Sequence, residues 1–595
     1  MMKHLKYLFL IMFFIRFTIP VQGQQLIDIT INPDSIINQS FQGLGVEWDP
    51  FFWFNGNQSK GLTESDWELI IERTKQMKLS QARIFVLPNW YEPVNDNSDA
   101  QVTDTAKFKF RSSEMSGLYR YLDVCDSLGI DVNLTIWGAR NDRLYGLGDY
   151  WLAFSESNNW ITAPNDLDEW AENVTALLNY LFHVRNYKCI THLTMSNEPN
   201  PPHQGFWTPS AINKKQYYLD MYKLVHRRLI EDGLRDKIKL VGADEADTDD
   251  FTWFTFMAEN SDSAMDILAS HTYAFDIDQS NYTVNIRNWV RQRLDALGNT
   301  GKPFFITEFG TNNGISPYVN PDVDTYERGF FLADFVINSM NEGASLLSYW
   351  TLHDIWYQYG KLMQLGLWAY YDQQWRLRPS WYVWSLMSRF ITKNSMVIDV
   401  GSSQSDLVAA TAVMNNDGKL TIIVANRDTQ DQIVRVTVND SGDRKFKKYI
   451  YDRTIIDSLS DELLPESGLF TDTVDTLHAQ SITLYSEISP SEVKENLGIG
   501  KPDKFRIIQN YPNPFNPSTM VKYELPEQSN IKIEIFNMLG QSVGVLANSE
   551  KQAGFYEVMW NAENLPSGVY LISIIAEGSN SHKSFSQVKK ALLLK

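Results

Sequence analysis

The fold of this chain is decided by two short stretches, Ser196-Asn197-Glu198-Pro199-Asn200 and Thr307-Glu308-Phe309-Gly310. Each stretch follows a short apolar run, Leu193-Thr194-Met195 in the first case and Phe304-Phe305-Ile306 in the second. Short apolar runs of this kind indicate buried β-strands. Both stretches therefore place a glutamate, Glu198 or Glu308, at the carboxyl end of a predicted strand.

Eight predicted strands alternate with predicted helices over residues 41–392. The strands cover residues 43–48, 82–87, 131–137, 192–197, 238–243, 266–273, 303–309 and 345–352. Intervening segments such as 64–77, 115–128 and 166–186 carry apolar residues at helical spacing. This alternation predicts an α/β fold, a closed (β/α)₈ TIM barrel, whose catalytic face is formed by the carboxyl ends of the strands. A doubly wound open sheet is the alternative.

After residue 390 the sequence changes to short β-rich runs separated by turn residues such as Asn416-Asp417-Gly418. The predicted strands cover residues 397–400, 407–414, 420–426, 433–438 and 481–487. They predict a β-sandwich appended to the barrel, over residues 393–488. Residues 26–38 also have strand character, so we expect the N-terminal segment 24–40 to join this sandwich.

The last part of the chain is predicted to be a small all-β domain, residues 504–595, behind a polar linker at 489–503. It carries Asn510-Tyr511-Pro512-Asn513-Pro514-Phe515-Asn516-Pro517 and Phe536-Asn537-Met538-Leu539-Gly540-Gln541. These motifs resemble the type A sorting domain of the type IX secretion system of Bacteroidetes and their relatives. The resemblance implies recognition by the type IX secretion machinery and export across the outer membrane. A carbohydrate-binding or adhesion module is the alternative.

The N-terminus has the pattern of a secretory signal peptide, residues 1–23. Lys3 and Lys6 precede a mostly apolar run, and Val21-Gln22-Gly23 fits a cleavage site. A membrane anchor is the alternative, but the run is shorter than the roughly 20 residues that span a bilayer. We therefore expect no stable membrane insertion, and a secreted or cell-surface protein exported through the periplasm of a Bacteroidetes-like bacterium.

Composition narrows the classes of partner and cofactor. The 595 residues carry a formal net charge of −19, which argues against nucleic acid as a partner. The two cysteines, Cys125 and Cys189, form no disulfide framework; we expect buried thiols, with one bridge as the alternative. No His/Cys cluster has zinc spacing, and no glycine-rich loop follows a strand. The sequence thus predicts no cofactor and no metal site.

Glu198 and Glu308 are 110 residues apart (308 − 198), so only the fold can bring them together. At the ends of strands four and seven they would face one central cleft. Glycoside hydrolysis needs such a pair, because one carboxylic acid protonates the leaving oxygen while one carboxylate attacks or stabilises the anomeric carbon. Two glutamates in surface turns are the alternative.

The pair resembles that of the clan A retaining glycoside hydrolases, over residues 40–390. By this resemblance Glu198 is the acid/base, Glu308 is the nucleophile and Asn197 binds the 2-hydroxyl of the attacked sugar. A barrel with a C-terminal β-sandwich is similar to families 30 and 39, and family 5 stays open. The implied function is a secreted retaining β-glycosidase acting on a polysaccharide or oligosaccharide. The alternatives are a transglycosylase on the same site and a non-catalytic glycan-binding protein.

Other strand-end residues fit supporting roles in substrate binding. Arg83 on strand two would hold Glu308 ionised by its charge. His271 and Tyr273 end strand six, where the clan has a tyrosine that binds the nucleophile. Trp350 ends strand eight as the floor of a sugar subsite, and Trp137 ends strand three. Core packing or a barrel-interior ion pair is the alternative for each. Weaker candidates for subsites are Trp48, Asn89, Trp90, His203, His353 and Asp354.

Overall fold

The computed structural model describes residues 25–595 except for 141–149, 156–160, 202–204, 248–250, 277–278, 312–317, 319, 358–359, 441, 443, 458–465, 471–473, 489–504, 508–509, 511–512, 552–553, 580 and 582–583. The predicted signal peptide and the predicted linker lie outside the described residues.

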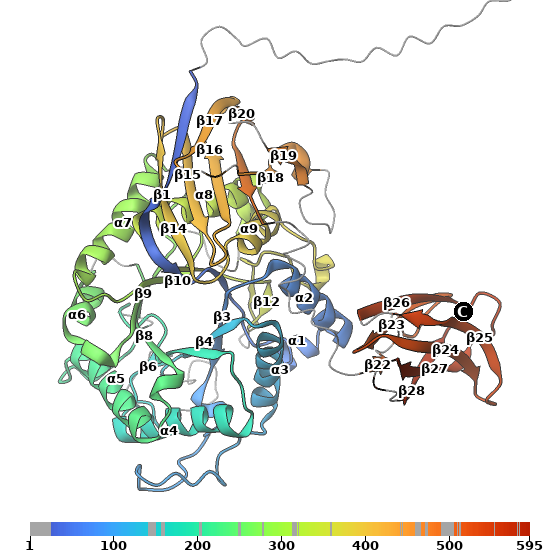
Figure 1. The fold of residues 1–595 in the computed structure, drawn as a ribbon. Helices are drawn as coiled ribbons and strands as arrows, with labels where there is room; N and C mark the ends of the chain where they lie inside the picture. Colours follow the sequence, from blue (N-terminus) through green and yellow to red (C-terminus); the bar gives the residue numbers. More distant parts are fainter. Residues whose placement is uncertain are drawn as a thin grey trace, which may run out of the picture.

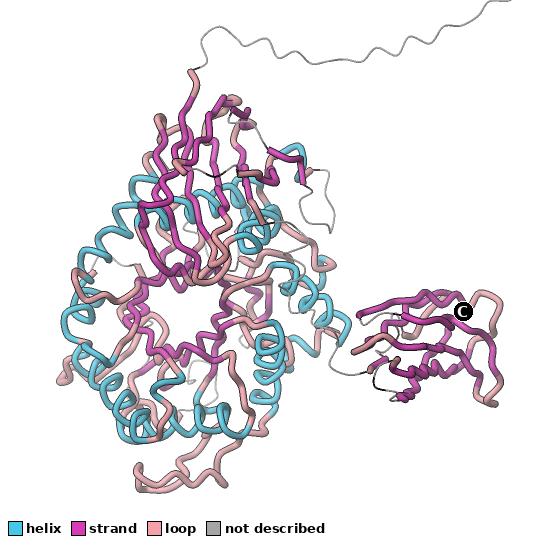
Figure 2. Tube along the Cα trace, in the orientation of Figure 1, coloured by secondary structure: helices cyan, strands magenta, loops and turns pink. Residues whose placement is uncertain are grey.

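Eight parallel strands close into a barrel, seen as the central ring in Figure 2. They are β2 (Leu44–Glu47), β3 (Gln81–Val86), β4 (Asp131–Ile136), β7 (Ile190–Thr194), β8 (Lys239–Glu245), β9 (Ile267–Thr272), β10 (Phe304–Phe309) and β11 (Leu346–Tyr349). Pairing of β11 with β2 closes the ring, so the predicted barrel is confirmed and the open sheet is wrong. Strand β8 runs two residues beyond its predicted end and carries Asp244 and Glu245 inside the strand.

Helices surround the ring (Figure 1). They are α2 (Glu64–Met77), α3 (Ser113–Leu128), α4 (Leu167–Asn179), α5 (Lys214–Glu231), α6 (Thr252–Asn260), α7 (Tyr282–Leu297), α8 (Tyr326–Glu342) and α9 (Pro379–Phe390). Local sequence explains their starts: Thr63 and Asp66 form a capping box on α2, and the Asp166 carboxylate accepts from the first turn of α4. The segment 166–186, predicted as one helix, changes after α4 into a π turn, Tyr180–Val184. This wider turn carries the Tyr180 ring that stacks on Phe110, with centroids 4.1 Å apart.

The β-sandwich is built from one continuous nine-stranded sheet in the order β19-β18-β21-β16-β15-β14-β1-β17-β20. The strands are β1 (Ile27–Phe41), β14 (Ser395–Ser402), β15 (Val408–Met414), β16 (Leu420–Asn426), β17 (Gln432–Val438), β18 (Phe446–Tyr451), β19 (Glu466–Phe470), β20 (Val474–Leu477) and β21 (Ser481–Ser486). Phe446 and Leu477, from opposite ends of the order, share one apolar cluster, so the sheet is folded over on itself. The N-terminal β1 lies within it, antiparallel to β14 and parallel to β17.

The C-terminal domain, red in Figure 1, consists of two sheets with an apolar core of its own. Its strands are β22 (Arg506–Ile507), β23 (Ser518–Leu525), β24 (Ser529–Asn537), β25 (Ser542–Lys551), β26 (Gly554–Asn561), β27 (Gly568–Gly578) and β28 (Ser584–Leu593). The Asn-Pro-Phe-Asn-Pro motif has a structural task here. Phe515 is buried against Trp560, and its N–H donates to the carbonyl of Leu592, a residue of the last strand.

Two expectations about the chain as a whole can be compared with the described residues. Cys125 and Cys189 are both free and buried, and burial raises the pKa of each thiol. None of the described helices combines the length and apolarity that a membrane span requires.

Candidate active site

Glu198 and Glu308 meet at the carboxyl end of the barrel. Glu308 is part of β10, and Glu198 follows β7 with a positive φ of 42°. The backbone N–H of Glu198 donates to the Asp244 carbonyl over 3.1 Å, which fixes this unusual conformation against β8. One carboxylate oxygen of each glutamate lies within 4.8 Å of the other. The Glu308 side chain is 4% exposed and that of Glu198 is 26% exposed, so Glu198 is the one open to solvent.

Arg83 is the hub of the site. This buried guanidinium donates to Glu308 Oε1 over 2.5 Å, to Asn197 Oδ1 over 2.6 Å and to Asp244 Oδ2 over 2.8 Å. It also donates to Glu47 Oε2, on the neighbouring strand, over 3.0 Å. One side chain thus orients both stretches that define the fold.

His271 and Tyr273 approach the two glutamates from the end of β9. His271 Nδ1 lies 3.0 Å from Glu198 Oε1 and 3.4 Å from Glu308 Oε2, and its Nε2 lies 3.1 Å from Asp244 Oδ1. The Tyr273 hydroxyl donates to Glu308 Oε2 over 3.0 Å. Glu308 is therefore held by side chains from β3 and from the end of β9, and Glu198 contacts the side chain of His271.

The pKa values follow from this network. Burial opposes the charged form of His271, but Glu308 and Asp244 outweigh it and raise the pKa of His271 to about 10. Burial also raises the pKa of Glu308, and the lowering by His271 and Arg83 offsets only part of that rise. The expected contact between Arg83 and Glu308 exists, but it does not bring the Glu308 pKa below its ordinary value.

Two carboxylates of the network were not predicted. Asp244 ends up beneath the site, where it accepts from Arg83 and from Thr307 Oγ1, the latter over 2.6 Å. Burial opposes its ionisation, but Arg83 and His271 outweigh burial and hold the pKa of Asp244 below its usual range. Burial raises the pKa of Glu47 well above its usual range, against the lowering by Arg83. Glu47 is the last residue of β2 and Asp244 the next-to-last of β8. The expectation that polar residues at the carboxyl ends of the strands form the site therefore applies to them too.

A group of three aromatic residues, Phe85, Trp137 and Trp350, begins beside Arg83. Its guanidinium carbon lies 4.9 Å from the Phe85 ring centroid, and Phe85 contacts both Trp137 and Trp350, at 4.6 and 5.8 Å. Trp137 and Trp350 are each 7% exposed. The two tryptophans predicted at strand ends therefore belong to one aromatic group with the hub, and Phe85 joins them.

The weaker candidates lie elsewhere or remain undescribed. Trp48 stacks on Trp67 inside the core, and Trp90 packs against Phe54. Asp354 accepts two hydrogen bonds of 2.7 Å from buried Arg378. His353 stacks on Trp368, 5.8 Å away, and Asn89 precedes Trp90 in a short 3₁₀ turn. His203 lies outside the described residues.

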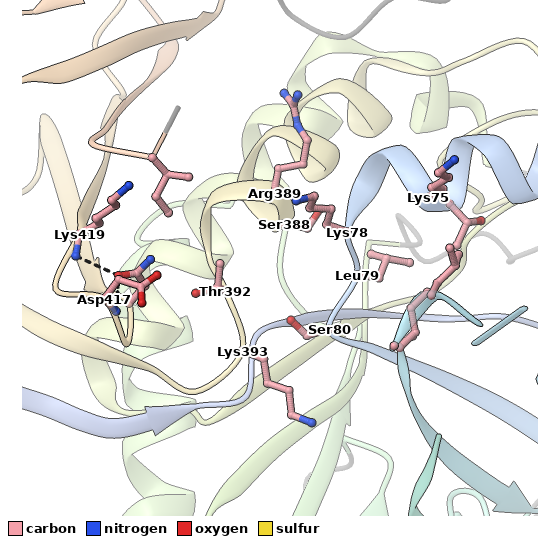
Figure 3. A pocket seen from close by; sticks show the side chains of 16 residues that line it. Lys75, Lys78, Leu79, Ser80, Ser388, Arg389, Thr392, Lys393, Asp417 and Lys419 are labelled. Carbon is pink, nitrogen blue, oxygen red and sulfur yellow. Dashed lines mark hydrogen bonds between the residues drawn. The ribbon is translucent and has the colours of Figure 1, made fainter. Parts of the chain in front are cut away.

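A separate, basic pocket lies at the other end of the barrel (Figure 3). Lys78, Arg389, Lys393 and Lys419 line it. Leu79, Ser80 and Ile130 also line it and precede β3 and β4, so the pocket opens at the amino ends of the strands. It is therefore not part of the site around Glu198 and Glu308.

Two sequence families match parts of this chain. The Glycosyl hydrolase family 30 beta sandwich domain matches residues 394–455, and the Secretion system C-terminal sorting domain matches residues 509–588. No curated protein matches the chain.

Solved structures resemble the barrel and sandwich together. A family 30 endoxylanase from Clostridium papyrosolvens C71 has a TM-score of 0.52 at 16% identity, covering 77% of this chain and 99% of the other. An endo-β1,6-glucanase has a TM-score of 0.55 at 13% identity, covering 77% and 93%. A family 39 β-xylosidase from Caulobacter crescentus has a TM-score of 0.50 at 17% identity, covering 77% and 99%.

At these identities the structural likeness shows the fold. The chain thus combines a barrel and sandwich with the fold of family 30 and family 39 glycoside hydrolases, a sandwich segment matching family 30, and a C-terminal secretion sorting domain.

Proposed function

We propose that the protein is a secreted retaining glycoside hydrolase that cleaves β-glycosidic bonds of a polysaccharide or oligosaccharide. The observation that carries this proposal is the approach of Glu198 and Glu308, with oxygens within 4.8 Å, from the ends of two different barrel strands. Retaining enzymes hold their carboxyl groups about 5–5.5 Å apart, whereas inverting enzymes leave about 6.5–9.5 Å for a water. The short separation supports retention.

The two glutamates have distinct tasks in this mechanism. Glu198, the more exposed side chain, protonates the glycosidic oxygen as the leaving group departs. Glu308 attacks the anomeric carbon and forms a glycosyl–enzyme bond. Glu198 then takes a proton from water, which attacks the same carbon and releases Glu308. Each step conserves protons, because the acid of the first step is the base of the second.

The neighbouring residues support these tasks. Arg83 and the Tyr273 hydroxyl donate hydrogen bonds to Glu308, and the charge of protonated His271, whose Nδ1 lies 3.4 Å from Glu308 Oε2, adds to the stabilisation of its carboxylate. Because Arg83 occupies Asn197 Oδ1, the amide nitrogen of Asn197 is left to donate to a sugar hydroxyl. Trp137 and Trp350 offer ring faces to the apolar C–H groups of the sugar.

The destination of the protein follows from its C-terminal domain. We propose that the type IX machinery recognises this domain after a signal peptide has directed the chain to the periplasm, and that the enzyme works outside the cell or on its surface. Xylan and β-1,6-glucan are the first substrates to test, because structures with this fold carry those activities in their names.

Two variants test the assignment of roles. Glu308→Ala should lower kcat by at least about 10⁴-fold on every substrate, because no nucleophile remains. Glu198→Ala should keep glycosylation of aryl glycosides with good leaving groups, because they need no acid, and azide should accelerate its turnover. Glu245→Gln is the matched control, because Glu245 is also a buried carboxylate on β8 but pairs with Arg293 on α7. Its kcat should stay close to that of the wild type.

Products complete the test. NMR of the first product should show the anomeric configuration of the substrate, and an inverted product would overturn the retaining mechanism. Equal loss in both variants on aryl glycosides, with no azide effect, would overturn the roles. Chromatographic sizing separates hydrolysis, which shortens chains, from transglycosylation, which also lengthens them.

A further inference from the structure

Three buried carboxylates meet beside the loop that follows β3, outside the site of Glu198 and Glu308. Asp96 belongs to this loop, and Glu169 and Glu172 lie on one face of α4. One oxygen of each lies within 4.8 Å of those of the other two. Asp96 and Glu172 are each 1% exposed, and Glu169 is 8% exposed.

Several oxygens of this cluster have no hydrogen-bond partner within the described part of the chain. They are Asp96 Oδ1, Glu169 Oε2 and both Oε1 and Oε2 of Glu172. The other Asp96 oxygen, Oδ2, accepts from Asn97 Nδ2 over 3.0 Å and from the Asp104 N–H. The side chains of Asn95 and Thr103 also lie near enough to Glu169 and Glu172 to lower their pKa values, but less than burial raises them. A buried carboxylate without donors is costly, by several kcal/mol for an ion left uncompensated. Four such oxygens in one place indicate that something else satisfies them.

The lysine and arginine side chains near the cluster do not pair with these carboxylate oxygens. Lys107 Nζ donates to the backbone carbonyl of Asp96, and its nearest carboxylate is that of Asp104, at 3.7 Å. Arg228 exerts a favourable charge effect on Glu172, but its guanidinium donates to the Ala100 carbonyl and to Gln101. Three acidic side chains thus face one another without an ion pair among the described residues.

Protonation is the other way to relieve the cluster. Burial raises the pKa of Glu172 to about 7 and also raises that of Glu169. Carboxyl groups that share protons would place donors on neighbouring oxygens. A bound cation and shared protons are thus the two explanations for the cluster. The first requires a metal ion, and the second requires a pH low enough for the carboxylates to be protonated.

We infer that Asp96, Glu169 and Glu172 form a Ca²⁺ site. Carboxylates alone are hard oxygen ligands, which suit Ca²⁺ or Mg²⁺ and not zinc or copper. Ca²⁺ accepts 6–8 oxygens in flexible geometry, whereas Mg²⁺ keeps several waters. The closeness of three carboxylates, with four oxygens that accept no hydrogen bond among the described residues, therefore favours Ca²⁺. A charge of +2 also offsets most of the charge of three carboxylates.

The ion would tie two separate parts of the barrel together. Asp96 comes from the long loop between β3 and α3, and the glutamates come from the first turns of α4, which follows β4 (Figure 1). Neighbouring contacts join the same parts, since Asn173 of α4 donates to Glu92 over 2.7 Å and accepts from the Tyr91 hydroxyl. The site would stabilise this loop at the carboxyl end of the barrel. Spacing could not reveal it, because Asp96 and Glu169 are 73 residues apart (169 − 96).

Ca²⁺ binding by the full-length protein tests the inference. After treatment with EDTA, addition of CaCl₂ to 100 times the dissociation constant should raise the melting temperature of the barrel by about 3 °C or more. Glu172→Gln should lose this increase, and equilibrium dialysis with ⁴⁵Ca²⁺ should find one equivalent fewer than in the wild type. In EDTA, Glu172→Gln should melt at or above the wild-type temperature, because it removes an uncompensated charge.

Asp168→Asn is the matched control, because Asp168 is an exposed carboxylate in the same helical turn. It should keep both the bound equivalent and the thermal shift. Equal Ca²⁺ binding by wild type and Glu172→Gln would overturn the site. So would a wild-type melting temperature that ignores Ca²⁺ but rises between pH 8 and pH 6, which is the signature of shared protons.

Discussion

The β-sandwich and the C-terminal domain are both all-β units that follow the barrel in sequence, but they are attached to it in different ways. The sandwich shares the apolar core of the barrel, since Val413, Ile423 and Leu484 belong to the same cluster as Phe331 of α8. Among the described residues, the buried core of the C-terminal domain begins at Ile507, with the partly buried Phe505 packed against it. The position of a domain in the sequence therefore does not show which parts of the molecule unfold together, because that depends on which parts share buried surface.

Polar contacts strengthen the junction between barrel and sandwich. Arg427 of the sandwich donates to Asp334 of α8 over 2.7–3.1 Å, and Asp334 is fully buried. The Tyr326 and Tyr451 rings stack 4.7 Å apart, and each hydroxyl donates to the backbone carbonyl of the other residue. The two units should thus behave as one cooperative body.

Truncation of the chain should show the largest difference between the β-sandwich and the C-terminal domain. A chain that ends at Phe390 removes β14 and β17, the partners of β1, and exposes the buried face of α8. We expect it to be unfolded. A chain that ends at Ser489 lacks only the linker and the C-terminal domain, and should keep its melting temperature within about 2 °C, since separate domains contribute little to each other's stability.

Circular dichroism and activity on a soluble substrate decide between these expectations. If the chain ending at Ser489 loses much of its kcat/KM, the C-terminal domain contributes to substrate binding as well as to export. If the chain ending at Phe390 melts cooperatively, the sandwich is a separate body, contrary to the shared core.

Removal of one buried charge at the junction has the next largest effect. Asp334→Asn leaves the largely buried Arg427 guanidinium, 11% exposed, without this counterion, and breaking a buried pair costs about 3–5 kcal/mol. Lys532→Ala is the counterpart in the C-terminal domain, because Lys532 pairs with Glu534 and its side chain is 44% exposed. That change should cost less than about 1 kcal/mol. Urea unfolding of both variants checks the contrast, and similar losses would contradict it.

The difference between fully buried strands and strands at the edge of a sheet explains how much of the fold could be predicted from the sequence. The barrel strands were found because fully buried parallel strands give apolar runs that end abruptly in polar residues, as Phe304-Phe305-Ile306 does before Glu308. Two strands of the sandwich left weaker patterns: β19 and β20 are short and lie at the ends of the sheet order, and in β20 only Leu477 is buried. The polar segment 489–503 and the motifs that follow it separated the C-terminal domain, and its strands β24 and β27 alternate between buried and less buried residues.

The candidate site was predictable to the extent that it lies on strand ends. Glu198, Glu308, Arg83, His271 and Tyr273 meet because parallel strands deliver their carboxyl ends to one place. Asp244 was not predicted because the predicted strand ends at residue 243, two residues before the end of β8. The net pKa of Glu308 depends on burial against several nearby charges, and no sequence pattern contains those distances.

A glycine at the junction allows a test of packing. A Cβ on Gly329 of α8 would lie 2.0 Å from the Tyr451 hydroxyl, so Gly329→Ala should cost about 1–3 kcal/mol by overpacking. Tyr451→Phe in the same chain removes the clashing oxygen and should recover part of the loss. Gly544→Ala in the C-terminal domain meets no atom within 4 Å and should be close to neutral. Chemical denaturation of the three variants gives the comparison, and a neutral Gly329→Ala would mean that the junction can open without cost.

Lowering the pH should have the smallest effect on stability. The group that responds, Asp452, lies on the sandwich side of the junction. Asp452, next to Tyr451, accepts from the Ile455 N–H over 2.8 Å and from Thr454 Oγ1 over 2.7 Å, and faces His478 Nδ1 at 2.5 Å. Burial opposes its ionisation, but these donors outweigh burial and hold the pKa of Asp452 below its usual value. A carboxyl with a lowered folded-state pKa contributes stability above its unfolded value, and that contribution is lost as the pH falls through the folded value. Asp452→Asn keeps the helix cap but not the charge, so the wild type should be more stable by roughly 0.5–1 kcal/mol at pH 6. The gap in melting temperature should be constant between pH 5 and pH 6, where His478 is charged, and shrink below about pH 4. A gap that stays constant down to pH 3 would show that the Asp452 charge contributes nothing to the junction.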